Sequence, residues 1–233
     1  MDRSIFLGDK RMTKSRAATL LAVMLVMAIS PLALNAATVT SYNTYSGWYD
    51  STGSHDNGNT NYFTGNEEGT QLNDFFVFDL AGPSGNVLSA TFNVYSYEVE
   101  ASGTYTIYAT SLTPAIEGDC TGCVSTYNAL TSGAVIGSLS VTPSDSDSWL
   151  QLGLNSAGLA WLQANEGGQI VLGGSFPQPL NPNSEDAVFS YSDFNAGNNL
   201  SITTSAAPEA STLLLLCTGV LGLAGALRRK SIV

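Results

Sequence analysis

Two cysteines three positions apart, Cys120 and Cys123, carry the most specific chemistry in this 233-residue chain. They stand in a Cys-Thr-Gly-Cys loop, and in an exported protein this spacing favours a small disulfide. Free thiols are the first alternative. A redox centre needs a βα context that the surrounding sequence lacks, and a zinc site needs more partners than the single histidine, His55, supplies. We therefore expect a disulfide between Cys120 and Cys123.

Nucleophilic catalysis finds little support in the sequence. His55 lies in the polar segment Gly-Ser-His-Asp-Asn-Gly-Asn, which is not a strand-to-helix elbow, so we expect a solvated loop histidine. Glycoside hydrolysis needs two carboxylates that face each other across a sugar, but a chain rich in carboxylates always offers pairs. The sequence therefore predicts no enzyme. A secreted carbohydrate-active enzyme is the alternative, and a cleft with two facing carboxylates would favour it.

The distribution of charge narrows the choice of partners. From Thr38 to Ala207 the chain contains sixteen carboxylates but no lysine and no arginine. Binding to phosphate backbones depends on cationic side chains, so nucleic acid is not expected as a partner and anionic lipid surfaces are disfavoured. Cations and neutral sugars remain as ligands.

Calcium is the one cofactor that the sequence suggests. Two acidic clusters, Asp50 with Asp56 and Asp145 with Asp147, have no lysine or arginine nearby in the sequence, and hard divalent cations bind such oxygen ligands. Neither cluster matches an EF-hand loop. The alternative, which the sequence favours, is a solvated acidic surface that keeps a secreted protein soluble. A calcium-binding adhesion module is accordingly a second alternative function.

Aromatic residues gather in the same N-terminal part of the body. Trp48, Tyr49 and Tyr62 flank a loop rich in asparagine and aspartate, and aromatic faces beside such side chains make platforms for sugars. Aromatic residues in β-rich chains more often belong to the core. A glycan site at these three residues is thus predicted with core packing as its alternative.

The body has the pattern of β structure. Leu88, Ala90, Phe92 and Val94 alternate with polar residues, which indicates a strand with one face inward. Further predicted strands cover residues 75–78, 105–110, 135–141, 150–154, 169–173, 187–191 and 200–204, of which 75–78 is apolar enough to be covered on both faces. Because Gly, Pro, Asn and Ser clusters separate the strands, we expect an all-β fold, an antiparallel, jelly-roll-like β-sandwich.

One short helix is expected to interrupt this pattern. Asn155 offers a side-chain oxygen as its N-terminal cap, and Gly167 marks its end. Trp161 on this helix is expected to lie in the core.

The N-terminus predicts export. A basic region is followed by an apolar run over residues 17–34 and by the small-residue sequence Leu-Asn-Ala-Ala. Residues 1–37 are therefore predicted to be a helical secretory signal peptide, cleaved after Ala36 or Ala37, with a permanent anchor as the alternative. Residues 38–205 then form one β-sandwich domain, long enough for one sizeable core.

The C-terminal segment 206–233 combines Pro208 and Glu209, an apolar run over residues 213–227, and the basic cluster Arg228, Arg229 and Lys230. Fifteen helical residues span only about 22 Å, which is short for a lasting anchor in a core of about 30 Å. The segment resembles the PEP-CTERM sorting signal of bacteria that secrete exopolysaccharide, although alanine stands where the signature has its second proline. A plain transmembrane tail anchor is the alternative.

This resemblance implies both partners and a location. The secretion machinery would export the chain, the transmembrane run would hold it transiently in the inner membrane, and an exosortase-type membrane peptidase would recognise Pro208 and Glu209. The product would reach the cell surface or the extracellular space. The predicted function is that of a non-enzymatic surface or extracellular-matrix protein associated with exopolysaccharide, with extracellular polysaccharide as a further partner.

The body resembles a second family. The strand end Phe78-Asp79-Leu80 and the strand from Val87 to Tyr95 are similar to the core of DNRLRE-type jelly-roll modules of bacterial surface proteins, over about residues 70 to 175. The resemblance implies a β-sandwich and transfers no substrate.

Overall fold

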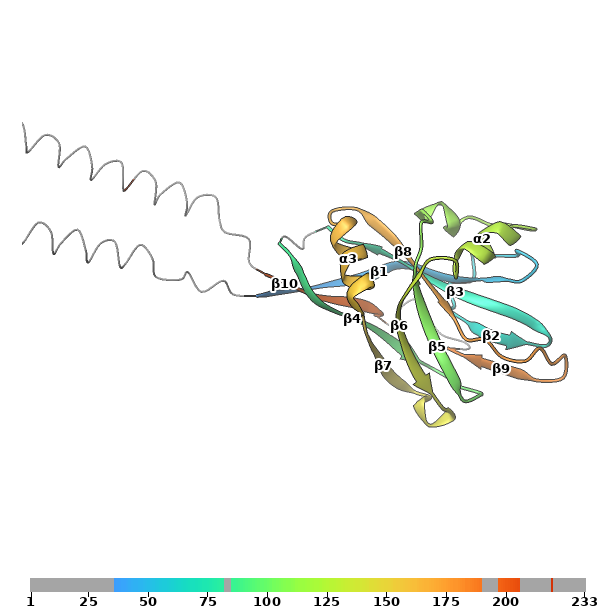
Figure 1. Ribbon diagram of the computed structural model, residues 1–233. Coiled ribbons are helices and arrows are strands. Elements are labelled where there is room, and N and C mark those ends of the chain that lie inside the picture. The colour runs from blue at the N-terminus through green and yellow to red at the C-terminus, as the bar shows by residue number, and fades with distance from the viewer. Residues whose placement is uncertain (1–35, 82–84, 190–196, 206–218, 220–233) are drawn as a thin grey trace, which may run out of the picture. The chain divides into compact units, whose positions relative to one another are not determined.

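The computed structural model describes residues 36–81, 85–189, 197–205 and Gly219 (Figure 1). The chain divides into a compact unit from Ala36 to Ala206 and a second unit made of residues 1–35 and 207–233. The predicted signal helix and the predicted transmembrane run lie outside the described residues, except for Ala36, Ala37 and Gly219.

The first unit is an antiparallel β structure. Its strands are β1 Ala37–Asp50, β2 Thr64–Glu67, β3 Thr70–Asp79, β4 Val87–Ser96, β5 Gly103–Ala109, β6 Ala134–Val141, β7 Ser148–Gly153, β8 Gln169–Ser175, β9 Glu185–Val188 and β10 Asn199–Thr204. They follow the order β6-β5-β8-β3-β1-β10-β4-β7, with β2 beside β3 and β9 beside β2. Every pair of these strands is antiparallel, which confirms the predicted fold class.

The long strand β1 belongs to both layers of the sandwich. Residues 37–42 pair with β10, whereas residues 43–50 pair with β3, and the register with β3 shifts between Asn43 and Tyr45. We call β1, β10, β4 and β7 the front sheet, and β1, β3, β8, β5 and β6 the back sheet. The sequence did not predict β1, because its alternating positions carry Thr, Ser and Tyr rather than apolar and polar residues in turn.

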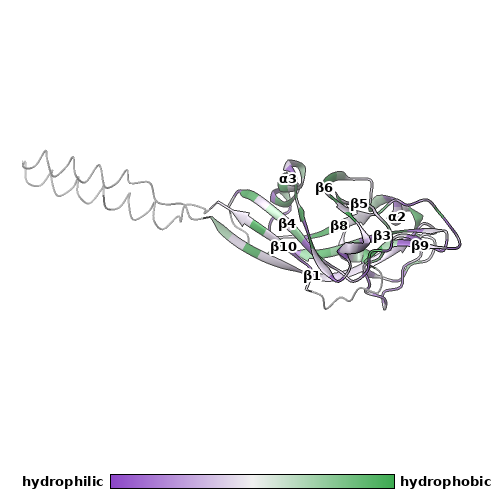
Figure 2. Ribbon diagram, turned by 90° about the horizontal axis from the view of Figure 1, so that it is seen from below, coloured by the Kyte–Doolittle hydropathy of each residue, from purple (hydrophilic) through white to green (hydrophobic). Residues whose placement is uncertain are grey.

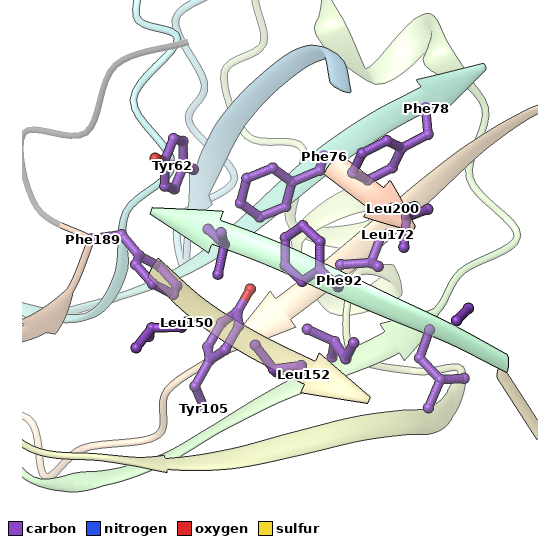
Figure 3. Packing of buried hydrophobic residues seen from close by; sticks show 14 of the residues in the cluster. Tyr62, Phe76, Phe78, Phe92, Tyr105, Leu150, Leu152, Leu172, Phe189 and Leu200 are labelled. Carbon is purple, nitrogen blue, oxygen red and sulfur yellow. The ribbon is translucent and has the colours of Figure 1, made fainter. Parts of the chain in front are cut away.

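The core between the two sheets is largely aromatic and aliphatic (Figure 3). The ring of Phe92 on β4 lies 4.9 Å from the ring of Phe76 and 6.0 Å from that of Phe78, both on β3. The predicted alternation of β4 is therefore confirmed at Phe92, as it is at Ala90 and Val94. Leu88 departs from it: its side chain is 54% exposed, and it falls at the register shift between β10 and β4, where Thr203 pairs with Ser89 and Thr204 with Val87.

A second apolar cluster covers the outer side of the back sheet. Phe75 and Val77 point away from the main core and pack with Tyr49, Ile116 and Leu130. The covering residues come from β1, from the 3₁₀ helix η1 (Pro114–Glu117) and from the end of helix α2 (Val124–Ala129). Residues 75–78 are thus buried on both faces, as their apolar run predicted, whereas α2 was not predicted.

Helix α3 (Ser156–Ala164) confirms the predicted helix. The Asn155 side-chain oxygen accepts hydrogen bonds from the backbone N–H groups of Ala157, at 2.9 Å, and Gly158, at 3.1 Å. Three residues beyond the helix, Gly167 has a φ of +76°, a conformation that glycine adopts without strain. Trp161 packs against the main core, as expected.

Candidate functional site

The cysteine loop docks on the segment that holds His55. The structure pairs Cys120 and Cys123 as a disulfide. The backbone N–H of His55 donates to the Cys120 carbonyl at 2.9 Å, and the return bond measures 3.0 Å. The N–H of Cys123 donates to the carbonyl of Gly53, where φ is +82° and a Cβ would collide with the Cys123 backbone. Glycine is therefore required at position 53.

In the native, unreduced protein Cys120 and Cys123 should resist alkylation, and the intact mass should be two hydrogens below the dithiol value. Because the closed loop is short, Cys123→Ser should lower the free energy of unfolding by only about 2 kcal/mol. Cys217→Ser is the control that should leave this mass difference and the stability of the body unchanged. Alkylation of both thiols in the native protein would rule the disulfide out.

His55 is buried rather than solvated, so the prediction of a solvated histidine is wrong. Its side chain is 4% exposed, and its ring stacks on that of Tyr49 at 4.7 Å, with Phe75 at its edge. Nδ1 lies 2.8 Å from the Trp48 carbonyl, which can only accept, so Nδ1 carries the proton. Burial lowers the pKa of His55, although the backbone carbonyls of Trp48 and Glu117 act against this. Nε2 is buried without a hydrogen bond of standard geometry.

The first pair of predicted calcium ligands lies in hydrogen-bonded turns. Oδ1 of Asp50 accepts from the backbone N–H of Thr52 at 2.9 Å and from its hydroxyl at 2.7 Å. Oδ1 of Asp56 accepts from the N–H of Gly58 at 2.8 Å. Both carboxylates thus satisfy backbone groups of their own loop.

The second pair lies before β7. Oδ2 of Asp145 accepts from the backbone N–H and the hydroxyl of Thr142, at 2.8 and 3.0 Å, and so caps the 3₁₀ helix η2 (Pro143–Asp145). Asp147 has a φ of +52°, in a turn. Within the part of the chain that the structure describes, no group of three or more acidic, histidine or cysteine side chains could hold a metal ion. Calcium binding stays a prediction.

The predicted glycan platform is largely covered by the protein itself. Tyr49 is 2% exposed and Tyr62 is fully buried, and their hydroxyls donate to the carbonyls of Ile116, at 2.8 Å, and Tyr95, at 2.9 Å. Both belong to the core, so a sugar cannot stack on either ring in this conformation. Trp48 is half-buried and packs against the small cluster of Phe63, Leu72 and Ala187, so it is the least covered of the three.

A buried carboxyl that the sequence analysis missed lies at the centre of the back sheet. Both oxygens of Asp74 lie 3.1 Å from the hydroxyl of Tyr105 on β5, and Gly174 faces Asp74 from β8. Burial raises the pKa of Asp74 to about 8 and that of Tyr105 well above its usual value. Asp74 directly precedes the apolar run 75–78, and this position next to a strand predicted to be covered on both faces could have indicated that Asp74 is buried. An acid buried this deeply is not accessible to an external substrate.

Three further carboxylates meet where β2, β9 and residues 98–100 come together. Glu67 and Glu185 lie directly opposite each other in the register of β2 and β9. Glu100 accepts from the N–H of Ala187 at 3.0 Å and shares a hydrogen bond with Glu185. Burial, and then the charge of Glu185, raise the pKa of Glu100 to about 7.

Residues 206–230 match the family model of the PEP-CTERM protein-sorting motif. The chain carries a PEP-CTERM sorting motif. This confirms the predicted tail, and Pro208, Glu209, Arg228, Arg229 and Lys230 all fall within the matched segment, although they lie outside the described residues. No curated protein matches the chain, so no homologue supports the jelly-roll resemblance of its body.

The PEP-CTERM motif implies recognition by an exosortase and a secreted protein that is processed at the membrane and destined for the cell surface. Among the described residues, no helix is long and apolar enough to cross a membrane. The signal peptide over residues 1–37 and the transmembrane run over residues 213–227 stay predictions.

Proposed function

We propose that this chain is a non-enzymatic exported protein of the cell surface or of an extracellular matrix that contains exopolysaccharide. The PEP-CTERM motif at residues 206–230, which follows a β-sandwich body, carries the proposal. The β-sandwich is the domain that is exported, and the tail is its sorting signal. The secretion machinery and an exosortase are the proposed partners, and the protein is anchored transiently in the inner membrane before it is processed.

The state of the ionisable groups supports a non-enzymatic role. Asp74 is sealed in the back sheet against Tyr105, and Glu100 is engaged with Glu185 and the Ala187 backbone. His55 packs among aromatic rings with Nδ1 held by a carbonyl. Groups with shifted pKa values are candidates for catalysis when they line a cleft, but these are occupied by structural contacts.

Glu209→Ala should block processing of the tail. In a host that carries an exosortase, the wild-type protein should lose part of residues 206–233, whereas the variant should keep its complete C-terminal tail and stay in the membrane fraction, because the peptidase recognises Pro208 and Glu209. Intact mass and membrane fractionation measure this.

Ser211→Ala is the matched control, since it changes a neighbouring tail residue and should be processed normally. In a host without an exosortase the wild type and both variants should keep the complete C-terminal tail. Release of Glu209→Ala with the wild-type C-terminus would contradict the sorting role of this tail.

A further inference from the structure

The outer face of the front sheet is a neutral polar surface on an acidic protein. The registers place Tyr42, Asn199, Asn93 and Gln151 in one row across β1, β10, β4 and β7. Their neighbours along the strands, Leu200, Phe92 and Leu152, lie in the core. Because successive residues of a strand point to opposite faces, the row faces outward. The remaining outward residues of the paired segments are Ser, Thr, Gly, Tyr and Trp, and none carries a charge. Figure 2 shows the alternation as green and pale bands along these strands.

Aromatic rings stand at both edges of this face. Tyr42 on β1 is 61% exposed and Trp149 on β7 is 47% exposed. Trp149 lies opposite Tyr95 on β4, and their rings meet edge to face at 5.4 Å. Three strand spacings separate β1 from β7, so the two exposed rings lie about 15 Å apart. Figure 1 shows the four strands side by side.

Amide side chains occupy the space between the rings. Nδ2 of Asn93 donates to Oδ1 of Asn199 at 2.9 Å, and Nδ2 of Asn199 donates to the Gly197 carbonyl at 3.0 Å. The two amides are thereby oriented, and each side-chain oxygen has a second lone pair available for a ligand hydroxyl. Gln151 continues the row as an exposed side chain at the β7 edge.

We propose that the outer face of the front sheet binds a neutral polysaccharide chain. Tyr42 and Trp149 would stack against sugar rings, whose C–H faces are apolar, while Asn93, Asn199 and Gln151 exchange hydrogen bonds with hydroxyl groups. An acidic polysaccharide is disfavoured, because residues 38–207 contain sixteen carboxylates and no lysine or arginine. The inference rests on the proposed location in a polysaccharide-containing layer but not on processing of the tail.

Binding can be measured with the full chain purified in detergent. Hydroxyethylcellulose and dextran serve as neutral probes in affinity gel electrophoresis, with alginate as the anionic comparison. At least one neutral polymer should retard the wild-type protein, and alginate should not. Trp149→Ala and Tyr42→Ala should each raise the dissociation constant about tenfold, because each removes one of the two exposed rings on which sugars would stack.

Two controls separate this face from the rest of the surface. Leu180→Ala removes an exposed apolar side chain that lies outside the front sheet, and Trp48→Phe changes the half-buried member of the first predicted platform. Both should bind as the wild type does. Thermal unfolding of the Tyr42 variant should stay close to the wild-type transition, because this side chain is 61% exposed. The transition of the Trp149 variant should fall only slightly, because Trp149 is 47% exposed and loses one edge-to-face contact with Tyr95.

Several results would overturn the proposal. The proposal fails if neither neutral polymer retards the wild-type protein, or if alginate alone retards it. It also fails if both aromatic variants bind with unchanged affinity, or if only Trp48→Phe loses binding. A change of oligomeric state in Trp149→Ala without loss of polysaccharide binding would assign the face to a second copy of the chain instead. Because the assay needs no exosortase, its failure is distinct from a failure of the Glu209→Ala experiment.

Discussion

Asp74→Asn should make the protein more stable relative to wild type as the pH rises, by about 1.4 kcal/mol per pH unit between about pH 4 and about pH 8. The unfolded chain releases the Asp74 proton near its ordinary pKa of 3.8, whereas burial raises the pKa in the folded protein to about 8. Between these values the folded protein holds a proton that the unfolded chain has lost. The stabilising contribution of Asp74 is therefore complete below pH 4 and is lost as the pH rises to 8. Asparagine has no such dependence.

Urea denaturation of both proteins at several pH values measures this difference. Other groups with shifted pKa values, such as Glu100, Glu67 and His55, change the stability of both proteins alike and so cancel in the comparison. Glu166→Gln, which removes an exposed carboxylate, is the matched control and should run nearly parallel to the wild type. If the free energy of unfolding of Asp74→Asn follows the same pH dependence as that of the wild type from pH 4 to pH 8, Asp74 is not a buried protonated acid.

Gly174→Ala should strongly destabilise the back sheet. A Cβ at position 174 would meet Oδ1 of Asp74 and the hydroxyl of Tyr105, and the strands on both sides leave it no room to move. Overpacking costs about 1–3 kcal/mol, and a buried polar group that loses its hydrogen bond costs about 1–3 kcal/mol more. Together these should lower the melting temperature by about 10 °C.

Gly153→Ala is the matched control for this substitution. Gly153 is also a strand glycine, but a Cβ there would meet nothing within 4 Å, so its free energy of unfolding should change by less than about 0.5 kcal/mol. Combining Gly174→Ala with Tyr105→Phe removes the hydroxyl, one of the three atoms that the new Cβ would meet, and leaves Oδ1 of Asp74 and the ring edge at position 105. The double variant should therefore be less destabilised than the sum of the single variants. Equal stabilities of Gly174→Ala and Gly153→Ala would show that the Asp74 and Tyr105 pair tolerates displacement.

The sorting motif and the fold class could be predicted from the sequence because both depend on local patterns. The PEP-CTERM motif is a contiguous stretch of residue types, and β4, with its alternation around Phe92, shows a period of two along the chain. Asn155 could be identified as a cap because the N–H groups that it accepts from belong to the next three residues. The absence of lysine and arginine from residues 38–207 predicts, without any knowledge of the fold, that nucleic acid is not a partner.

The tertiary structure alone decided which side chains are accessible. Tyr49, Tyr62 and Tyr42 come from one aromatic-rich segment, yet η1 and the main core cover the first two while Tyr42 faces outward from the front sheet. The pairing register of four strands aligns the row made of residues 42, 199, 93 and 151. Nothing in the local sequence links these four positions. Burial likewise sets Asp74 apart from the other carboxylates by raising its pKa to about 8, because desolvation depends on the neighbours that the fold supplies.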